Sequence, residues 1–228
     1  MSRPAIVFDL DGTLVDSLPD IVASFRWSFA TVGLEAPSEA AVRSHVGLPL
    51  EAMYALFAPP AAVVQLAAGY RRHYAEHLAD RSRPFPGVEA LLGELRERGY
   101  ALAVATTKQT PMALRLVAAM GLGHALDHVQ GTDGFPHKPA PDVIERALAA
   151  MGAAGHWMVG DTTHDVGAGK AAGLRTYAVT WGTHDEARLR AAGPDVVAPD
   201  LSALVPLLDR DGSVGDEDHR TGRDGAAG

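Results

Sequence analysis

The 228-residue sequence contains no cysteine, which excludes disulfide bridges and thiolate metal sites. It contains no apolar run of about 18 residues, so the sequence predicts no transmembrane helix and no membrane partner. The chain also lacks any block of Lys and Arg. Its 28 acidic and 20 basic residues give a formal net charge of −8, whereas a surface that binds a nucleic acid polymer is expected to be basic. These absences argue against both a membrane protein and a nucleic-acid-binding protein.

What remains is the composition of an ordinary globular protein, with 47% hydrophobic and 21% charged residues. A chain of this length can bury a sizeable core, and we expect one domain with at most a modest insertion. The first apolar run, Ala5–Phe8, meets Asp9 before it could form the core of a signal peptide. We therefore expect a cytoplasmic protein, either a monomer or a small homo-oligomer.

From about residue 84 onward, short apolar runs alternate with helical patterns. Together with Ala5–Phe8, the expected strands are 101–105, 126–130, 157–160, 176–179 and 195–198, and the expected helices are 88–98, 112–120, 141–151, 166–172, 186–192 and 201–208. Strands that alternate with helices in this way form a parallel sheet covered on both faces. The predicted fold class is α/β, with a doubly wound, Rossmann-like core.

The segment between the first two strands has a different pattern. Apolar residues such as Ile21, Phe25 and Phe29 recur at helical spacing, and no convincing strand interrupts residues 17–80. A Pro- and Gly-rich run at 83–87 indicates a boundary. We predict a core of residues 1–15 and 84–210 and an inserted, all-helical cap domain of residues 16–83. Residues 211–228 are rich in Gly, Asp and Arg, and we predict a disordered tail there.

Residues with reactive side chains follow several of the predicted strands. Asp9 and Asp11 follow the first strand, Thr106 and Lys108 the second, and Asp161 and Asp165 the fourth, while Lys138 lies in the Pro-rich loop after the third. Each residue taken alone is also typical of a turn, a helix cap or a solvated surface. In an open parallel sheet, however, ligands bind beyond the carboxyl ends of the strands. The combination therefore predicts one shared site.

The residue types in this set favour phosphoryl transfer. Clustered carboxylates repel one another, and a hard cation with oxygen ligands, Mg²⁺, would neutralise them. Zinc is the weaker candidate because the chain has no cysteine and no HExxH pair. An aspartate can act as a nucleophile on phosphorus, and a second carboxyl can protonate the leaving alcohol. A lysine and a threonine can hold the remaining phosphate oxygens.

Four ordered motifs made of these residues resemble those of the haloacid dehalogenase-like hydrolase superfamily. They are Asp9-Leu-Asp-Gly-Thr-Leu-Val-Asp-Ser17, then Thr106, then Lys138 in His-Lys-Pro-Ala-Pro-Asp, and finally Gly160-Asp-Thr-Thr-His-Asp165. The resemblance covers about residues 4–208 and is greatest to the phosphoglycolate phosphatase-like branch, which has a small helical cap. It implies a Mg²⁺-dependent phosphatase that hydrolyses a small-molecule phosphate monoester through an aspartyl-phosphate intermediate.

The resemblance also implies a role for each matched residue. Asp9 is expected to be the nucleophile and a metal ligand, and Asp11 the general acid/base, with its backbone carbonyl on the metal. Asp161 and Asp165 are the further metal ligands. The phosphate group is expected to be bound by Thr106, Thr107 and Lys138. Position 107 departs from the branch, which commonly has Asn there, and this leaves the exact substrate open.

The predicted cap offers two possible substrate contacts, Arg43 and His45, in a stretch whose Gly47 and Pro49 indicate a loop turned toward the site. Either side chain could meet a second negative group such as a carboxylate. A surface arginine and a structural histidine are an equally good interpretation. Phosphoglycolate is the best single substrate name from the sequence, with nucleotide and sugar phosphates as alternatives.

Single residues of this chain argue against other reactions known in the superfamily. Family dehalogenases usually carry an aromatic residue where this chain has Asp11, and phosphonate cleavage uses a cap lysine, whereas residues 16–81 contain no lysine. A phosphomutase is a further alternative, although Thr13 favours hydrolysis because mutases tend to have Val there. A phosphate-sensing protein without catalysis would not need Asp11.

Overall fold

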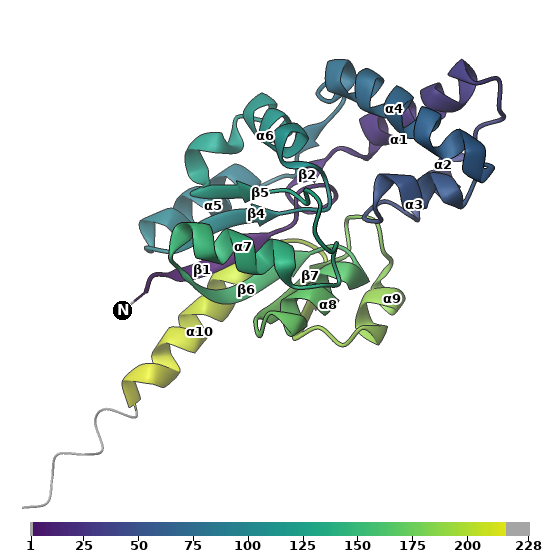
Figure 1. The fold of residues 1–228 in the computed structure, drawn as a ribbon. Coiled ribbons are helices and arrows are strands. Elements are labelled where there is room, and N and C mark those ends of the chain that lie inside the picture. The colour runs from purple at the N-terminus through teal and green to yellow at the C-terminus, as the bar shows by residue number, and fades with distance from the viewer. Residues whose placement is uncertain (1, 218–228) are drawn as a thin grey trace, which may run out of the picture.

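The computed structural model describes the backbone of residues 2–217 and the side chains of residues 2–210. Figure 1 shows a central sheet with helices on both faces and a separate group of helices, α1 to α4, beyond one end of it. The strands are β1 (Pro4–Phe8), β2 (Val15–Asp16), β3 (Arg83–Pro84), β4 (Ala101–Ala105), β5 (His128–Gln130), β6 (Ala154–Gly160), β7 (Arg175–Val179) and β8 (Val196–Ala198). The helices are α1 (Leu18–Thr31), α2 (Glu39–Arg43), α3 (Leu50–Ala55), α4 (Pro60–His77), α5 (Val88–Glu97), α6 (Thr110–Ala119), the short 3-10 helix η1 (Leu122–Ala125), α7 (Asp142–Met151), α8 (Thr163–Ala171), α9 (Glu186–Ala191) and α10 (Leu204–Glu217).

Six strands form one parallel sheet in the order β5-β4-β1-β6-β7-β8. The central strand β1 is apolar along almost its whole length because both of its faces are covered, and Ala5, Ile6, Val7 and Phe8 are fully buried. The chain builds one side of the sheet through β4 and β5 and then crosses to β6, so the strand order reverses beside β1. The predicted doubly wound α/β fold class is confirmed.

Alternate residues of β1 pack on opposite layers of helices. Ile6 and Phe8 belong to the larger apolar cluster, which includes Leu92 of α5 and Leu116 of α6. Val7 belongs to a second cluster with residues of α7 and α8 on the other face. This alternation follows from the period of two of a β-strand.

The α1–α4 group has an aromatic centre of its own. Phe25 of α1 stacks on Tyr54 of α3 with ring centroids 4.1 Å apart and planes 5° apart. The buried hydroxyls of Ser28 and Tyr54 lie 2.6 Å apart and satisfy each other. The chain leaves the core through β2 and returns through β3, and these two short strands pair antiparallel, with Asp16 opposite Arg83. We refer to this double crossing, together with the adjoining residues 17–20 and 79–82, as the hinge.

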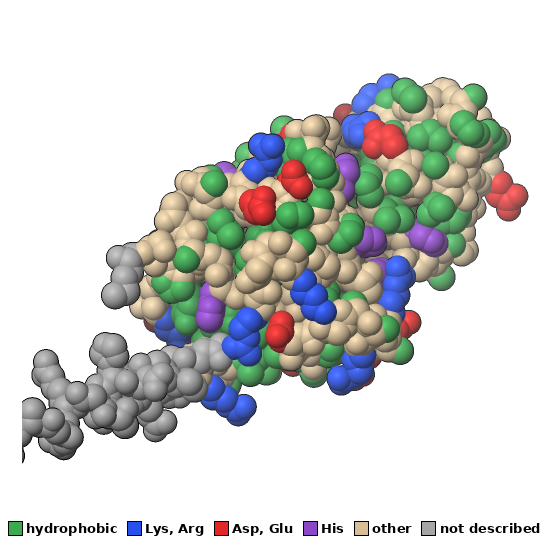
Figure 2. Space-filling view, turned by 60° about the horizontal axis from the view of Figure 1, so that its bottom comes forward, with side chains coloured by type: hydrophobic (Ala, Val, Ile, Leu, Met, Phe, Trp, Pro, Cys, Tyr) green, Lys and Arg blue, Asp and Glu red, His purple; other side chains and the backbone are tan. Residues whose placement is uncertain are grey.

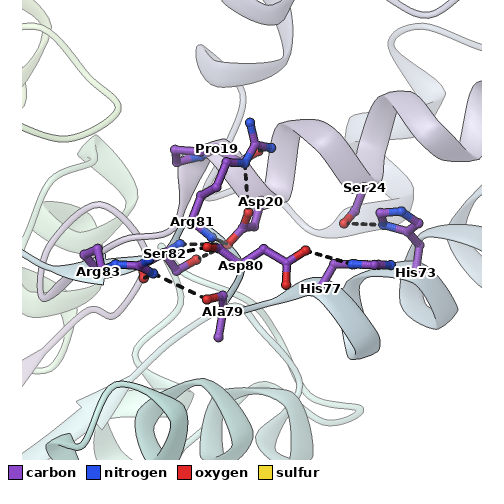
Figure 3. A network of polar contacts seen from close by, with 10 residues as sticks. All are labelled: Pro19, Asp20, Ser24, His73, His77, Ala79, Asp80, Arg81, Ser82 and Arg83. Atoms are coloured by element: carbon purple, nitrogen blue, oxygen red, sulfur yellow. Dashed lines mark hydrogen bonds and ion pairs between the residues drawn. The ribbon is translucent and has the colours of Figure 1, made fainter.

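A single buried carboxylate joins the two chain crossings at the hinge (Figure 3). Asp20 is only 2% exposed. It accepts hydrogen bonds from the backbone N–H groups of Arg81 and Ser82, at 2.9 and 2.8 Å, and from the Ser82 hydroxyl at 2.8 Å. The Arg81 guanidinium adds a fourth bond at 3.2 Å. Although burial opposes ionisation, these donors hold the pKa of Asp20 below its usual value. Asp20 is therefore a fully satisfied structural carboxylate.

Three elements differ from their predicted extents by three residues or more at one end at least. Strand β6 begins at Ala154, three residues earlier than expected, because the pairing with β1 extends back to Pro4. Helix α8 begins at Thr163, also three residues earlier, because Thr162 and Asp165 form a reciprocal cap at its start. Helix α10 runs to Glu217, seven residues into the predicted tail, since a nucleated helix extends at low cost. The rest of that predicted tail, 218–228, lies outside the described residues.

Candidate active site

The reactive residues meet at the carboxyl ends of three adjacent strands. Asp9 follows β1, Thr106 follows β4, and Asp161 follows β6, and these strands lie side by side in the sheet. This is also where the strand order reverses, the usual place for a ligand in an open α/β sheet. The sheet thus brings together Asp9 and Asp161, which are 152 positions apart in the sequence.

Three buried carboxylates form the centre of the site. Each of Asp9, Asp161 and Asp165 offers an oxygen atom, and these three atoms lie within 4.8 Å of one another. All three residues are at most 6% exposed. Oxygen donors in this number and spacing suit a hard divalent cation, and they form an acidic triad that could bind a metal.

The cluster already contains one positive charge, the ammonium group of Lys138. Its Nζ lies 2.7 Å from Asp9 Oδ1 and 2.5 Å from Asp165 Oδ1. A third hydrogen bond, at 3.0 Å, goes to the backbone carbonyl of Ala105 at the end of β4. All three donor positions of the ammonium are used, so Lys138 is fixed with one face against Asp9. One lysine against three carboxylates leaves the cluster two positive charges short.

The pKa values show which of the three carboxylates lack a compensating positive charge. Burial, with the neighbouring Asp165 and Asp161, raises the pKa of Asp9 to about 8, although Lys138 opposes the shift. Burial and Asp165 raise the pKa of Asp161 to about 7. The pKa of Asp165 moves the other way, because Lys138 and the donors of Thr162 outweigh the effect of burial. Asp9 and Asp161 are therefore the carboxylates that lack compensation at neutral pH.

Asp161 and Asp165 are positioned by hydrogen bonds from backbone N–H groups and threonine hydroxyls, none of which the sequence analysis predicted. Asp165 Oδ2 accepts from the backbone N–H and the hydroxyl of Thr162, at 2.9 and 2.6 Å. Asp161 accepts from the Thr13 hydroxyl at 2.8 Å and from the backbone N–H of Thr183 at 2.7 Å. Thr183 lies in the loop after β7, and no motif pointed to it. Only the strand order could have indicated Thr183, because β7 lies next to β6 in the sheet.

Two glycines make room for the Asp161 carboxylate. Gly12 has a φ of +87°, and a Cβ on it would stand 2.3 Å from Asp161 Oδ2. A Cβ on Gly182 would stand 2.2 Å from the same atom. Both distances are impossible for real atoms, so any side chain at these positions would push Asp161 out of the cluster.

Asp11 is not part of the triad, and two side chains contact its carboxylate. The Ser17 hydroxyl donates to its Oδ1 at 2.5 Å, and Lys108 Nζ lies 3.1 Å from its Oδ2. Lys108 also donates to the hydroxyl of Tyr74 in α4, at 3.2 Å, and lies 4.3 Å from the centre of that ring. Sequence analysis placed Lys108 at a strand end without giving it a role, and its contact with the α1–α4 group could not be read from the motif.

Thr106 and Thr107 directly follow β4, at the same edge of the sheet as the acidic triad. Thr106 is buried, and its hydroxyl oxygen accepts from the backbone N–H of Lys108 at 3.3 Å. Its hydroxyl proton has no acceptor among the residues that the structure describes, so it is available to a bound oxygen. Thr107 lines a cavity between the core and the α1–α4 group.

That cavity, which we call the cleft, has a volume of about 280 Å³. Asp11, Thr107 and Lys108 line it from the core. Gly47 and Leu48 line it from the loop between α2 and α3, which does turn toward the site. A Cβ on Gly47 would stand 3.2 Å from the Thr162 side chain, so this loop touches the core next to the acidic triad.

The structure does not bring the two predicted cap contacts into the cleft. Arg43 pairs with Glu39 at 3.6 Å and keeps 42% of its side chain exposed. His45 Nδ1 lies 2.8 Å from the carbonyl oxygen of Ala41, and the ring meets Phe57 edge-on. Neither residue is among those that line the cleft.

The surface has no broad patch of one charge on the face drawn in Figure 2, where acidic, basic and hydrophobic side chains are interspersed. Histidine side chains gather on that face near the junction of the core and the α1–α4 group. Within residues 2–217, no helix combines the length and the apolar character that a membrane span requires.

Comparison with known proteins agrees with this arrangement. The family described as haloacid dehalogenase-like hydrolase matches residues 6–179. The chain is 38% identical over 212 residues to a protein of Dickeya dadantii named "Probable phosphatase IndB", with 89% of this chain and 92% of that protein covered. It is 35% identical to a phosphoglycolate phosphatase of Mesorhizobium japonicum, with 92% and 97% covered.

A solved structure gives the same result at the level of the fold. A haloacid dehalogenase-like family hydrolase from Streptococcus pneumoniae superposes with a TM-score of 0.83 at 30% sequence identity. The alignment covers 91% of this chain and 98% of that one, so both the sheet and the α1–α4 group are included.

Proposed function

Because the chain belongs to the haloacid dehalogenase-like hydrolase family, we propose that it is a Mg²⁺-dependent phosphatase acting on a small-molecule phosphate monoester. The observation that carries the proposal is the undercompensated triad of Asp9, Asp161 and Asp165, with Lys138 against Asp9. Such a cluster is costly to bury unless a cation and a charged ligand use it. The names of the relatives support the same reaction class.

Mg²⁺ fits the donor set. The triad provides carboxylate oxygens only, the raised pKa values of Asp9 and Asp161 show that negative charge is undercompensated there, and no sulfur ligand competes. Asp9, Asp161 and Asp165 would hold the ion, together with the backbone carbonyl of Asp11. When bound, Mg²⁺ neutralises the carboxylates and the phosphate oxygens and so lets two negative groups approach each other.

Asp9 is the proposed nucleophile. Lys138 holds its Oδ1 at 2.7 Å and fixes the orientation of the carboxylate. The carboxylate attacks phosphorus, a new O–P bond forms, and the bond between phosphorus and the leaving alcohol oxygen breaks. The products of this step are an aspartyl phosphate and the free alcohol.

Asp11 is the proposed general acid and base. In the first step its carboxyl gives a proton to the leaving oxygen, and in the second step it takes a proton from the water that attacks the phosphorus of the aspartyl phosphate. This second attack releases inorganic phosphate and restores the Asp9 carboxylate. Ser17 and Lys108 hold Asp11 in the wall of the cleft, where a leaving group would lie.

Three groups are the proposed binders of the transferring phosphoryl oxygens. They are the Thr106 hydroxyl, whose proton is available, the backbone N–H of Thr107, and the Lys138 ammonium, which would act through its charge because its three donor positions are in use. Donors fixed in advance stabilise charge that develops in the transition state at little cost in reorganisation. The α1–α4 group, attached through the hinge, is the proposed cap that excludes water and contacts the leaving group.

The name of the Mesorhizobium relative makes phosphoglycolate the first substrate to assay. Nucleotide and sugar phosphates are the alternatives. A phosphomutase of the same family is the second candidate reaction, but Thr13 of this chain donates to Asp161, a contact that the valine typical of mutases could not make.

The test is a phosphate-release assay of the purified chain with Mg²⁺ and a panel of phosphate esters that includes phosphoglycolate, nucleoside monophosphates and sugar phosphates. Release of inorganic phosphate from at least one ester, stopped by exhaustive chelation, is the expected result. Formation of an isomerised phosphate ester without inorganic phosphate would favour the mutase. No reaction with any ester would contradict the proposal.

A further inference from the structure

His184 lies in the loop between β7 and α9 and contacts both segments that carry proposed metal ligands. The residue is only 3% exposed, although it belongs to a loop. Its backbone N–H donates to the backbone carbonyl of Asp161 at 3.3 Å. Its ring Nδ1 accepts a hydrogen bond from the backbone N–H of Thr163 at 3.0 Å. One buried residue thus connects Asp161, which follows β6, with the first residue of α8.

The hydrogen bond from Thr163 satisfies a donor that the helix itself cannot satisfy. Thr163 is the first residue of α8, and the first N–H groups of a helix have no acceptor within the helix. Thr162 and Asp165 satisfy other donors of this turn through their reciprocal cap. The His184 ring supplies the acceptor for Thr163. This acceptor role fixes the neutral tautomer of the ring, with its proton on Nε2.

The loop that carries His184 also positions the Asp161 carboxylate. Thr183 directly precedes His184, and its backbone N–H donates to Asp161 Oδ2 at 2.7 Å. A shift of this loop would therefore move a donor that holds one proposed metal ligand. A shift of Thr163 would move the helical turn whose third residue is Asp165, the other ligand of this pair. The two contacts of His184 fix both segments relative to each other.

The loop is also held on either side of His184 by contacts that do not involve the imidazole ring. Before it, Trp181 stacks on Phe85 with ring centroids 4.6 Å apart and planes 6° apart. After it, the Asp185 side chain caps α9 by accepting from the backbone N–H of Arg188 at 2.8 Å. A change of the ring is therefore expected to alter how the loop lies against α8 while the chain still folds.

Resting on the metal site proposed above, we infer that His184 is a positioning residue for Mg²⁺ binding. Its ring holds the start of α8 and its backbone holds Asp161, so that the carboxylates of Asp161 and Asp165 stay close enough to share one ion. His184 itself would not touch the ion. Groups that orient metal ligands from outside the coordination sphere change metal affinity by about 10- to 100-fold when they are replaced.

The test is titration calorimetry of Mg²⁺ into the full chain, without substrate, for the wild type and for variants of position 184. His184→Leu keeps the bulk but removes the acceptor, and its Kd for Mg²⁺ is expected to rise about tenfold. His184→Asn keeps an acceptor, because the amide oxygen is bonded to Cγ as Nδ1 is. The Kd of His184→Asn is expected to return most of the way to the wild-type value.

The neighbouring His164 provides a matched control. Its ring centroid lies 6.0 Å from that of His184, and its Nδ1 is buried without a hydrogen-bond partner among the residues that the structure describes. His164→Leu therefore removes an imidazole next to Asp165 but no hydrogen bond from that nitrogen to the start of α8. We expect its Kd for Mg²⁺ to match that of the wild type.

The outcomes separate the role of His184 from the metal site itself. A wild-type Kd in His184→Leu, or an equal loss of affinity in His184→Asn or in His164→Leu, would overturn the inference. His184→Gln, whose amide oxygen lies one bond beyond the position of Nδ1, is expected to lose affinity as the leucine variant does, and it decides the matter if His184→Leu does not fold. If the wild type binds no Mg²⁺, or if Asp161→Asn binds it equally well, the proposed metal site fails, and the role of His184 fails with it.

Discussion

Two regions of the protein bury aspartates, yet they treat the charge in opposite ways. At the hinge, Asp20 accepts four hydrogen bonds from Arg81 and Ser82, and its pKa falls (Figure 3). At the sheet edge, burial raises the pKa of Asp9 to about 8 and that of Asp161 to about 7. The hinge supplies more hydrogen-bond donors, and Asp20 lies closer to the surface, beside the exposed Arg81 side chain. A satisfied buried carboxylate stabilises the fold, whereas an undercompensated one indicates a site that needs a ligand.

The largest expected contrast comes from neutralising one aspartate in each region. Asp9→Asn should lower kcat by roughly a thousandfold or more, because the nucleophile is lost. The folded protein should be no less stable, since a neutral amide replaces a carboxyl group whose charged form the fold disfavours. Phosphate release and denaturant unfolding of the same preparation measure both effects. Activity within tenfold of the wild type would refute the role of Asp9.

The second expected contrast between the two regions is in the stabilisation that metal binding gives. Free Mg²⁺ at 100 times its Kd should stabilise the wild-type fold by about 2.7 kcal/mol, because only the folded chain assembles the triad. Asp161→Asn should lose most of this stabilisation, and Asp20→Asn should keep it. Thermal unfolding with and without Mg²⁺ measures the effect. Equal stabilisation of all three proteins would place the metal elsewhere.

At the hinge the expected effect is on stability. Asp20→Asn replaces a charged acceptor of four hydrogen bonds and should lower the free energy of unfolding by about 1–3 kcal/mol. Activity should persist in the folded fraction, because Asp20 touches neither the triad nor the cleft. Denaturant unfolding gives the first quantity and kcat at a temperature well below the transition gives the second. A loss of kcat as large as that of Asp9→Asn would remove the distinction between the regions.

The smallest effect for each measured step is expected in the pH dependence of stability without metal, followed one pH unit at a time. Unfolded aspartates ionise near pH 4, whereas Asp161 and Asp9 ionise in the fold at about 7 and about 8. Between these limits the folded chain binds more protons than the unfolded chain, so the free energy of unfolding should fall as pH rises, by the order of 1 kcal/mol per pH unit.

The hinge again provides the contrast. The lowered pKa of Asp20 contributes stability that is present above pH 4 and is lost as pH falls through its folded value. Asp9→Asn should therefore flatten the decline between pH 4 and pH 8, while Asp20→Asn should leave it in place. Urea unfolding at several pH values after chelation measures the slopes. A wild-type stability that rises from pH 5 to pH 8 would contradict the raised pKa values.

The sequence allowed the α/β class and the shared edge to be predicted because both depend on local pattern. Continuous apolar runs such as Ala101–Ala105 predict buried strands, and parallel strands place their carboxyl ends together. The same reasoning brought Asp9, Asp161 and Lys138 to one place. The roles of Arg43 and His45 in binding substrate stay a prediction that the positions of these side chains do not favour.

Contacts between distant segments could not be predicted from the sequence. Lys108 bridges Asp11 and Tyr74, and Thr183 holds Asp161, through loops whose paths depend on packing. The four donors to Asp20 come from residues 61 and 62 positions away. In an apolar helical pattern, an aspartate gives no sign of the partners that tertiary structure will bring to it.

Titration calorimetry of Mg²⁺ into the metal-free protein at pH 6 tests the central claim most directly. If Asp9 and Asp161 are protonated there for lack of compensation, binding of the ion must displace protons. Repeating the titration in buffers of different ionisation enthalpy counts them, and we predict the release of about one to two protons for each bound ion. Binding without proton release, or no binding at the triad, would contradict the account.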